Sequence, residues 1–377
     1  MRPPDSLGRE ISPPPTRKRP TIAAVETGRA HVQDHLDYFS KHLQTRSRPS
    51  SGPRLGIDAF RSLYARNQHL KGRHFVIHQH DHPISGVHYD LRLQFSESST
   101  VSFAIPYGLP VNANSVRPHR MAIETRVHNL WNNLIESASH ASGSLLIWDT
   151  GEYEIMPQHE RDRQMTDDDG DDDLDPQLDR VSDSERLFAA FQSRRIRLRL
   201  HGSKLPAGYT MRMWLPSAND RSGPSRNPRL KRRRIDPTKF SEALKSRSAD
   251  TESDRDEDDT DDITTNTSAT DDYAAIASDT DEDAAVRSNN AYTGASNSIG
   301  SVHQRHWFLS LDRRRSGFRK ERTGPDRGQW VGGWDPIFVR GIDFERSLIT
   351  GRMADDVMAD EGVEKFIGRK MWRPILE

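Results

Sequence analysis

The most informative segment of this chain is FVIHQHDHPISGVHYDLRLQF, from Phe75 to Phe95. Two runs in which polar and apolar residues alternate flank a turn that contains Pro83 and Gly86, and this pattern predicts an antiparallel β-hairpin. In the second run, Tyr89 and the alternate residues after it are apolar, so they form the predicted core face.

The opposite face of the second run is polar in an unusual way. It presents His88, Asp90, Arg92 and Gln94, at intervals of about 6–7 Å along the strand. A strand face that only contacts solvent more often carries Lys, Glu, Thr and Ser. An imidazole, a carboxylate and a guanidinium in a row therefore indicate a functional site.

The hairpin also brings histidines of the first run toward this face. His78, His80 and His82 precede the turn, so the end of the first strand returns beside His88 and Asp90. Two imidazoles and one carboxylate suit a divalent metal such as Mn²⁺, Fe²⁺ or Zn²⁺, and three protein ligands leave positions open for water and substrate. One histidine alone would more often bond to the backbone, whereas two beside an aspartate favour a metal.

A second polar face is predicted in HRMAIETRVHNLW, residues 119–131, where Arg120 and His128 share one parity. Arginine binds phosphate oxygens through two parallel N–H groups, and an imidazolium can donate to a phosphoryl or a leaving oxygen. Arg92 and Arg120 beside a metal would therefore form a phosphate clamp. An equally open alternative is that these arginines lie on the surface and pair with Glu124.

The composition narrows the possible classes of protein. The 377 residues carry 55 Lys and Arg against 56 Asp and Glu, a net charge of −1, and only 33% of them are apolar, which favours one core of modest size and much disordered chain. Cysteine is absent, which excludes disulfides, thiolate zinc sites and thiol nucleophiles. The N-terminus lacks an apolar signal region, and no apolar run approaches the ~18 residues of a membrane span, so we expect a soluble, non-secreted protein without membrane contact.

We predict a mainly β fold: a small antiparallel β-barrel with a few short helices and long disordered acidic insertions. The boundaries assign residues 1–34 to disorder, 35–72 to a helical lead-in, and 73–216 to the barrel with an acidic insert at 160–185. Residues 217–300 form a disordered basic and acidic linker. Residues 301–377 hold a final strand at 306–311 and a helical tail, with a helix expected over 352–368.

Three further segments have specific interpretations. LLIWDTGEYEI, residues 145–155, reads as a buried scaffold strand that ends at a turn at Asp149–Gly151 and places Trp148 in the core. RNPRLKRRR, residues 226–234, is either a basic linker or a nuclear-import patch, so we expect a nuclear protein, or otherwise a cytoplasmic one. GQWVGGWDP, residues 328–336, is a late strand and turn or a docking element.

Together these segments resemble the 3′-phosphoesterase domain of bacterial ATP-dependent DNA ligase D and its standalone relatives. That family shows a His-Asp pair at a strand end, a His-Tyr-Asp-x-Arg-Leu-Glu strand, a Ser-Trp-x-x-Pro-x-Gly segment, an Arg eight residues before a His, and a Trp-Asp-x-Gly turn. The matching positions here are His80-Asp81, His88 to Gln94, Ser102 to Gly108, Arg120 with His128, and Trp148 to Gly151.

The resemblance implies a small β-barrel that binds one Mn²⁺ and heals 3′ ends of DNA in repair, as a phosphodiesterase and phosphomonoesterase. It would remove a terminal 3′-ribonucleoside and then the 3′-phosphate, leaving a 3′-OH. By position, the metal ligands are His80, His88 and Asp90, with His82 as the alternative to His80, and the scissile phosphate contacts Arg92, Arg120 and His128. The implied partners are the 3′ ends of primer–template nucleic acid and a DNA repair ligase or polymerase, and we expect a monomer.

Several positions depart from the family pattern. Seven residues separate His80 from His88 where the family keeps five. The pairing of His80 with Asp81 still favours His80 as the ligand. Tyr107 replaces a family Lys, and Arg126-Val127 replaces a Glu-Asp pair. The Arg-Asp pair and the Glu that the family contributes near its N-terminus have no evident match. The resemblance therefore implies metal binding more firmly than both reaction steps.

Two other classes of function remain open. His88-x-Asp90 with a distal histidine is also the spacing of a non-haem Fe(II) oxygenase, which turnover with 2-oxoglutarate and O₂ would reveal. The basic first half, with 18 Lys and Arg against 12 Asp and Glu in residues 1–150, also fits a non-catalytic nucleic-acid-binding barrel. Binding by that protein would depend steeply on salt and persist after Asp90→Ala.

Overall fold

The computed structural model describes residues 20–26, 30–157, 181–220, 286–369 and 372–376. Most of the predicted acidic insert, the basic run at 226–234 and most of the linker at 217–300 lie outside these residues. The described residues up to Asp220 and those from 286 onward belong to one compact unit.

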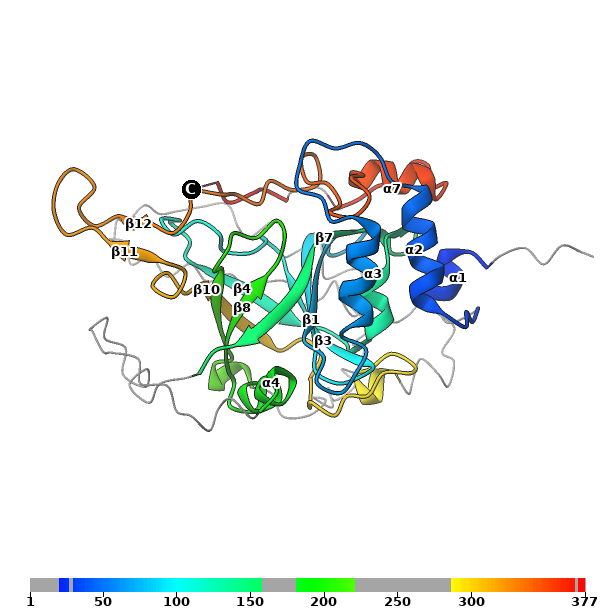
Figure 1. Ribbon diagram of the computed structural model, residues 1–377, viewed down its shortest axis with the longest axis horizontal. Helices are drawn as coiled ribbons and strands as arrows, with labels where there is room; N and C mark the ends of the chain where they lie inside the picture. Colours follow the sequence, from blue (N-terminus) through cyan, green and yellow to red (C-terminus); the bar gives the residue numbers. More distant parts are fainter. Residues whose placement is uncertain (1–19, 27–29, 158–180, 221–285, 370–371, 377) are drawn as a thin grey trace, which may run out of the picture. The chain divides into compact units, whose positions relative to one another are not determined.

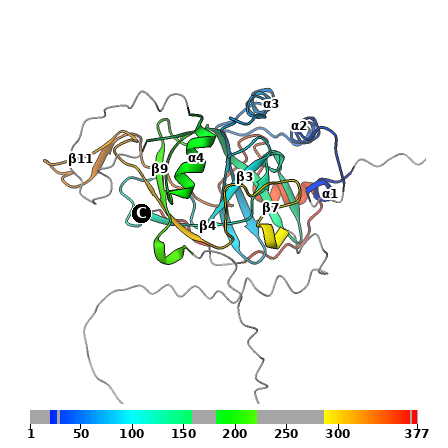
Figure 2. The ribbon, with the colours of Figure 1, turned by 90° about the horizontal axis from the view of Figure 1, so that it is seen from below.

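The core of this unit is an antiparallel sheet that closes on itself as a ring, which confirms the predicted mainly β fold (Figures 1 and 2). Strands β1 (His74–His82) and β7 (Gly143–Ile155) pair with each other and close the ring. Its strands, in spatial order, are β1 (His74–His82), β2 (Gly86–Gln94), β3 (Ser99–Ile105), β4 (His119–Glu124), β10 (His306–Leu311), β9 (Thr210–Trp214), β8 (Arg195–His201) and β7 (Gly143–Ile155). Two short strands, β5 (His128–Asn129) and β6 (Ser137–Ser139), pair with β3 and β7.

The β1–β2 hairpin follows the predicted alternation of faces. Tyr89, Leu91 and Leu93 of β2 are fully buried in the main hydrophobic core, as expected from their spacing. The register places His80 opposite His88. His78, which precedes His80 on the same face of β1, lies opposite Asp90. The turn is closed by Gly86, whose φ of +74° favours glycine.

Short helices cover one side of the ring, as the sequence predicts for residues 35–72. They are α2 (His35–Thr45) and α3 (Ile57–Ala65). Asp34 caps α2 by accepting a hydrogen bond from the Asp37 backbone N–H. Phe39 of α2 and Phe60 of α3 pack into a second hydrophobic cluster beside β1 and β7.

The prediction of disorder is wrong for the described parts of residues 1–34 and 217–300. A helix, α1 (Ile22–Glu26), forms in the Pro- and Arg-rich N-terminal stretch because Ile22 and Val25 bury their side chains against the second cluster. At the far end of the predicted linker, Ala291 bridges to Val127 of the ring. The short 3₁₀ helix η4 (Ser217–Asn219) also lies inside that predicted linker.

The turn predicted at Asp149–Gly151 is also wrong, because β7 runs through it without a break. A register shift in the β1–β7 pairing lies beside it. The buried Asp149 carboxylate accepts hydrogen bonds from the backbone N–H groups of Thr150, Ser203 and Leu205. A Cβ at Gly151 would lie 1.9 Å from the carbonyl oxygen of His201, so only glycine fits. Trp148 is buried, as predicted.

The C-terminal region is held to the ring by a buried ion pair. Arg352 donates to Glu136 at 2.9 Å, and both side chains are fully buried. The helix that follows, α7 (Ala354–Asp360), is shorter than the predicted 352–368. The remaining elements are η1 (Leu130–Leu134), α4 (Asp183–Gln192), β11 (Phe318–Lys320) and β12 (Trp330–Gly332). Among the described residues, no helix has both the length and the apolar character that crossing a bilayer requires.

Candidate metal centre and phosphate-binding residues

Two imidazoles and one carboxylate converge on the polar face of the β1–β2 hairpin. The Asp90 carboxylate lies 3.3 Å from Nδ1 of His80 and 3.3 Å from Nε2 of His88. One ligand atom from each of the three residues lies within 4.8 Å of the other two. Since His80 and His88 are paired across the two strands, the backbone of the hairpin fixes this arrangement.

The other nitrogen of each ring is held by a backbone carbonyl. Nε2 of His80 lies 2.7 Å from the Ser142 oxygen, and Nδ1 of His88 lies 2.9 Å from the Gly86 oxygen. A carbonyl oxygen can only accept, so these nitrogens carry the protons and the nitrogens facing Asp90 are available as ligands. Anchoring of the distal N–H is the usual support of a metal-bound histidine, and the donor set therefore fits a divalent cation.

Electrostatics keep a negative charge at the centre of this group. Burial alone would raise the pKa of Asp90, but the His88 charge and hydrogen bonds from both imidazoles hold that pKa well below its usual range. For His88, burial works against the charged ring, whereas the Asp90 carboxylate raises the pKa of His88 above its ordinary value. A divalent cation would compete with the proton that the Asp90 carboxylate favours on His88.

His82 lies outside this donor set. Its ring centroid is 5.3 Å from that of His80 and 6.4 Å from that of His88. Its Nδ1 accepts hydrogen bonds from the backbone N–H groups of Ile84 and Ser85, so the side chain shapes the turn. Burial, followed by the charges of His80 and His88, lowers the pKa of His82 to about 4. The geometry favours His80 as the partner of His88 and Asp90.

Arg92 adds a buried positive charge beside the donors. Its Nη2 lies 3.9 Å from Asp90 Oδ2, and its Nη1 donates to the carbonyl oxygen of Asn132 at 3.2 Å. Burial lowers the pKa of Arg92, and the Asp90 carboxylate opposes that effect. Its buried Nε has no hydrogen-bond partner among the described residues. A buried, unpaired guanidinium donor is suited to an anion.

His128 lies on the same face through the pairing of three strands. Thr100 of β3 is opposite both Gln94 of β2 and His128 of β5, and residues paired across strands share a face. Burial, followed by the positive charge of Arg92, holds the pKa of His128 well below its ordinary value. The ring is therefore neutral and lies 4.7 Å, between ring centroids, from Tyr292.

Arg120 does not join this group, which corrects the predicted clamp. Arg120 is paired with Leu309, a core residue, and Glu124 of the same parity is paired with Phe103. The Arg120 guanidinium donates to the backbone oxygens of Arg117 and His119, inside the ring. Strand β4 ends at Glu124, so the alternation that linked Arg120 to His128 in the sequence is interrupted between them.

The alternative pairing of surface arginines with Glu124 is also wrong. Glu124 is fully buried and accepts from Arg305 and from the indole N–H of Trp307. Arg305 comes from the segment before β10, far away in the sequence, which no local pattern could indicate.

The sequence patterns do not indicate two residues that lie beside the site. Glu26 of α1 accepts from Ser137 at 2.8 Å, and its charge acts on Arg92. Tyr292 packs on His128. Both lie in stretches predicted to be disordered. The apolar spacing of Ile22 and Val25 was the one signal for a helix near Glu26.

The comparisons with known proteins point to one family. The family model described as DNA Ligase D 3′-phosphoesterase domain matches residues 78–212. The "Multifunctional non-homologous end joining protein LigD" of Mycolicibacterium smegmatis is 34% identical over 84 residues, which are 21% of this chain and 10% of that protein. The "Multifunctional non-homologous end joining DNA repair protein LigD" of Mycobacterium tuberculosis H37Rv is 33% identical over 93 residues, 24% of this chain and 12% of that protein.

The chain thus spans about a tenth of the length of the curated relatives that it matches. The match covers β1 from His78 onward through most of β9, the part of the ring that carries both the candidate metal ligands and His128. Residues 78–212 therefore match the DNA ligase D 3′-phosphoesterase domain family, in agreement with the resemblance of the sequence motifs.

Proposed function

We propose that this protein is a metal-dependent phosphoesterase that restores 3′-OH ends on DNA during end-joining repair, by removing a 3′-phosphate or a 3′-ribonucleoside. The observation that carries the proposal is the convergence of His80, His88 and Asp90 beside the buried Arg92. This group lies within the segment that matches the phosphoesterase family.

The cation would be held by Nδ1 of His80, Nε2 of His88 and the carboxylate of Asp90. When bound, such an ion supplies Lewis-acid stabilisation of phosphoryl oxygens. Mn²⁺ is the ion that the family resemblance implies, and mixed imidazole and carboxylate donors accept it. The hydrogen bonds from the two rings to Ser142 and Gly86 would keep the donors oriented before the ion arrives.

Arg92 would bind and orient the scissile phosphate. Its guanidinium is buried and held by the Asn132 carbonyl, so little side-chain entropy is lost when an oxyanion binds it. In a site with little water, its charge would stabilise the negative charge that develops on the phosphoryl group.

His128 would hold or move a proton at the same phosphate. As a neutral ring it can donate one N–H to a phosphoryl oxygen. The arrival of an anion would favour its protonated form, which can give a proton to the leaving oxygen. The pairing of β5 with β3 places it on the Arg92 face.

The oxygenase alternative has weaker support. Its predicted facial triad needed His128 as the distal ligand, and His128 is not part of the donor group. The set of His80, His88 and Asp90 has the composition of such a triad. However, a buried guanidinium 3.9 Å from Asp90 favours an anionic phosphate beside the metal.

The test is a 3′-phosphate-terminated primer–template incubated with the full chain, in EDTA and with Mn²⁺, Mg²⁺ or Zn²⁺. We expect release of phosphate that requires a divalent ion and that falls at least a hundredfold in Asp90→Asn and in His88→Asn. The exposed His69 provides a matched histidine control as His69→Asn, which should keep full activity. Activity that survives in EDTA or in both site variants would refute the assignment.

A further inference from the structure

The segment between β10 and the C-terminal region forms a hairpin that does not belong to the ring. β11 and β12 pair with each other as a separate two-stranded sheet, and the hairpin extends away from the ring (Figure 1). The sequence GQWVGGWDP, predicted to be either a late strand and turn or a docking element, includes β12.

This hairpin carries a concentrated positive charge. Residues 313–327 contain seven Arg and Lys against two acidic residues, in a chain whose net charge is −1. Five of these basic side chains are exposed. Four of the five have no ion pair within the described part of the chain: Arg319, Lys320, Arg322 and Arg327. Exposed Arg and Lys side chains that form no ion pair within the protein are available to bind a polyanion.

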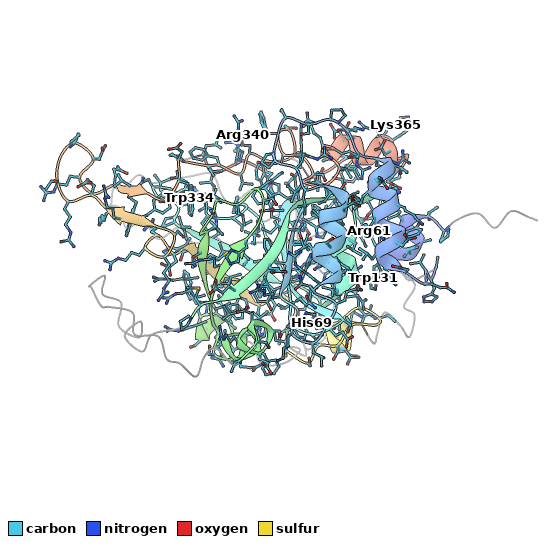
Figure 3. All side chains as sticks on the ribbon, viewed as in Figure 1. Arg61, His69, Trp131, Trp334, Arg340 and Lys365 are labelled. Atoms are coloured by element: carbon cyan, nitrogen blue, oxygen red, sulfur yellow. The ribbon has the colours of Figure 1, made fainter. Side chains whose placement is uncertain are left out.

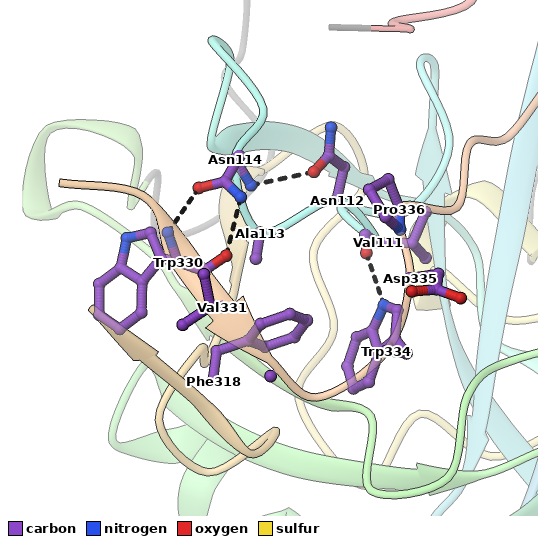
Figure 4. Close-up of a pocket in the computed structure, with 11 residues that line it drawn as sticks. Val111, Asn112, Ala113, Asn114, Phe318, Trp330, Val331, Trp334, Asp335 and Pro336 are labelled. Carbon is purple, nitrogen blue, oxygen red and sulfur yellow. Dashed lines mark hydrogen bonds between the residues drawn. The ribbon is translucent and has the colours of Figure 1, made fainter. Parts of the chain in front are cut away.

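A pocket of about 210 Å³ lies at the base of the hairpin and is rich in aromatic side chains (Figure 4). Trp330, Trp334 and Phe318 line it together with the loop at 111–114. Trp334 is fixed by its indole N–H, which donates to the Val111 carbonyl, and by edge contact with Phe318.

Trp330 is also held in place. The Asn114 side-chain amide accepts a hydrogen bond from the backbone N–H of Trp330 at 2.8 Å and donates one to the backbone carbonyl of Trp330 at 2.9 Å, as a neighbouring strand would. The Arg313 guanidinium lies 5.1 Å from the centre of the Trp330 ring. The indole is half-buried, so it lines the pocket without being enclosed in the core.

We propose that the β11–β12 hairpin and its pocket bind an unpaired nucleic-acid strand, a site separate from the metal centre. These four exposed cations contact successive phosphates, and one base stacks on Trp330. Exposed Arg and Lys beside a fixed aromatic ring are the features that bind single strands without sequence preference. The proposal rests on the proposed function, because the strand would be the unpaired part of the DNA end whose terminus the metal centre processes.

The test is binding of a fluorescein-labelled single-stranded 20-mer with a 3′-OH end, followed by anisotropy in EDTA over a salt titration. The hairpin variant carries Ser at positions 319, 320, 322 and 327. It should bind at least tenfold more weakly at low salt, with a salt slope smaller by about 2–3, since each phosphate contact contributes about 0.7. Trp330→Leu should weaken binding about five- to a hundredfold and leave the slope unchanged.

The control variant removes four positive charges elsewhere and should bind within twofold of the unchanged chain. It carries Ser in place of Lys41, Arg46, Arg61 and Lys71. Arg61, on α3, lies well apart from Trp334 in Figure 3. Far-ultraviolet circular dichroism and thermal melting should show that both variants keep their fold, because none of the substituted side chains is buried.

The two proposals can fail separately. Asp90→Asn should lose phosphate release and still bind the oligonucleotide as tightly as the unchanged chain, because the metal site does not contribute in EDTA. Four results would overturn the hairpin proposal: unchanged affinity in the hairpin variant, an equal loss in the control variant, tighter binding of a duplex than of the single strand, or equal competition by a polyglutamate of the same length.

Discussion

Removing one partner of the buried ion pair between Arg352 and Glu136 should strongly destabilise the fold. Arg352 also donates to Thr350 and to Asp360, and Glu136 accepts from Thr350 at 2.7 Å and from the backbone N–H of Ile147. Arg352→Met keeps the apolar volume and leaves the Glu136 carboxylate buried without its counter-charge. We expect the free energy of unfolding to fall by about 3–5 kcal/mol, the usual effect of removing one partner of a buried pair.

That loss is a large fraction of the ~5–15 kcal/mol that stabilises a typical protein. The assay is urea denaturation followed by circular dichroism, with the slope against urea compared between variants. The matched variant is Glu136→Gln, which keeps the hydrogen-bonding shape of the carboxylate without its charge. When the two substitutions are combined, the total loss should be smaller than the sum by at least 1 kcal/mol, because no unpaired charge is left. A loss below 1 kcal/mol for Arg352→Met, or strict additivity, would refute this account of the pair.

Four other outcomes follow from the structure. Saturating Mn²⁺ at about a hundred times its Kd should stabilise the chain by about 2.7 kcal/mol in a thermal melt, and His80→Asn should abolish this shift. Arg92→Lys should lower kcat/KM by at least tenfold in the phosphate-release assay, because an ammonium cannot bind a phosphate through two parallel N–H groups; unchanged kinetics would contradict its role. Burial lowers the pKa of His74 from its ordinary value of 6.5 to about 3 in the folded chain. As the pH falls below about 6.5, this histidine therefore becomes protonated in the unfolded chain but not in the folded one, and stability is lost. Urea unfolding of His74→Gln should therefore show a loss between pH 7 and 5 that is smaller by about 2 kcal/mol. Gly151→Ala should destabilise the ring by several kcal/mol because its Cβ meets the His201 carbonyl, and a calorimetric melt within 2 °C of the unchanged chain would contradict this.

The donor group could be located from sequence because it depends on one short hairpin. A period of two fixes the faces of neighbouring strands, and a tight turn fixes their register, so His80, His88 and Asp90 could be brought together without knowledge of the rest of the fold. Local pairing of this kind is the part of a β structure that a sequence specifies most directly.

The predictions that were wrong depended on where strands end and on contacts between distant segments. The parity rule for Arg120 and His128 assumed one unbroken strand, but β4 ends at Glu124, where the carboxylate turns into the core to meet Arg305. Composition indicated disorder for the segment of Glu26, since Pro and Arg dominate it. In both cases a tertiary contact outweighs the local pattern, and no short window contains that information.

The ring is completed by a strand that is synthesised late. β10 inserts between β4 and β9, and it lies more than 180 residues after β4 and more than 90 after β9 in the sequence. A nascent or truncated chain that stops before His306 has the metal-binding hairpin but exposes two unpaired strand edges, which are the surfaces through which β proteins aggregate. Fragments expressed without β10 should therefore be recovered mainly in inclusion bodies, even though they contain every candidate metal ligand.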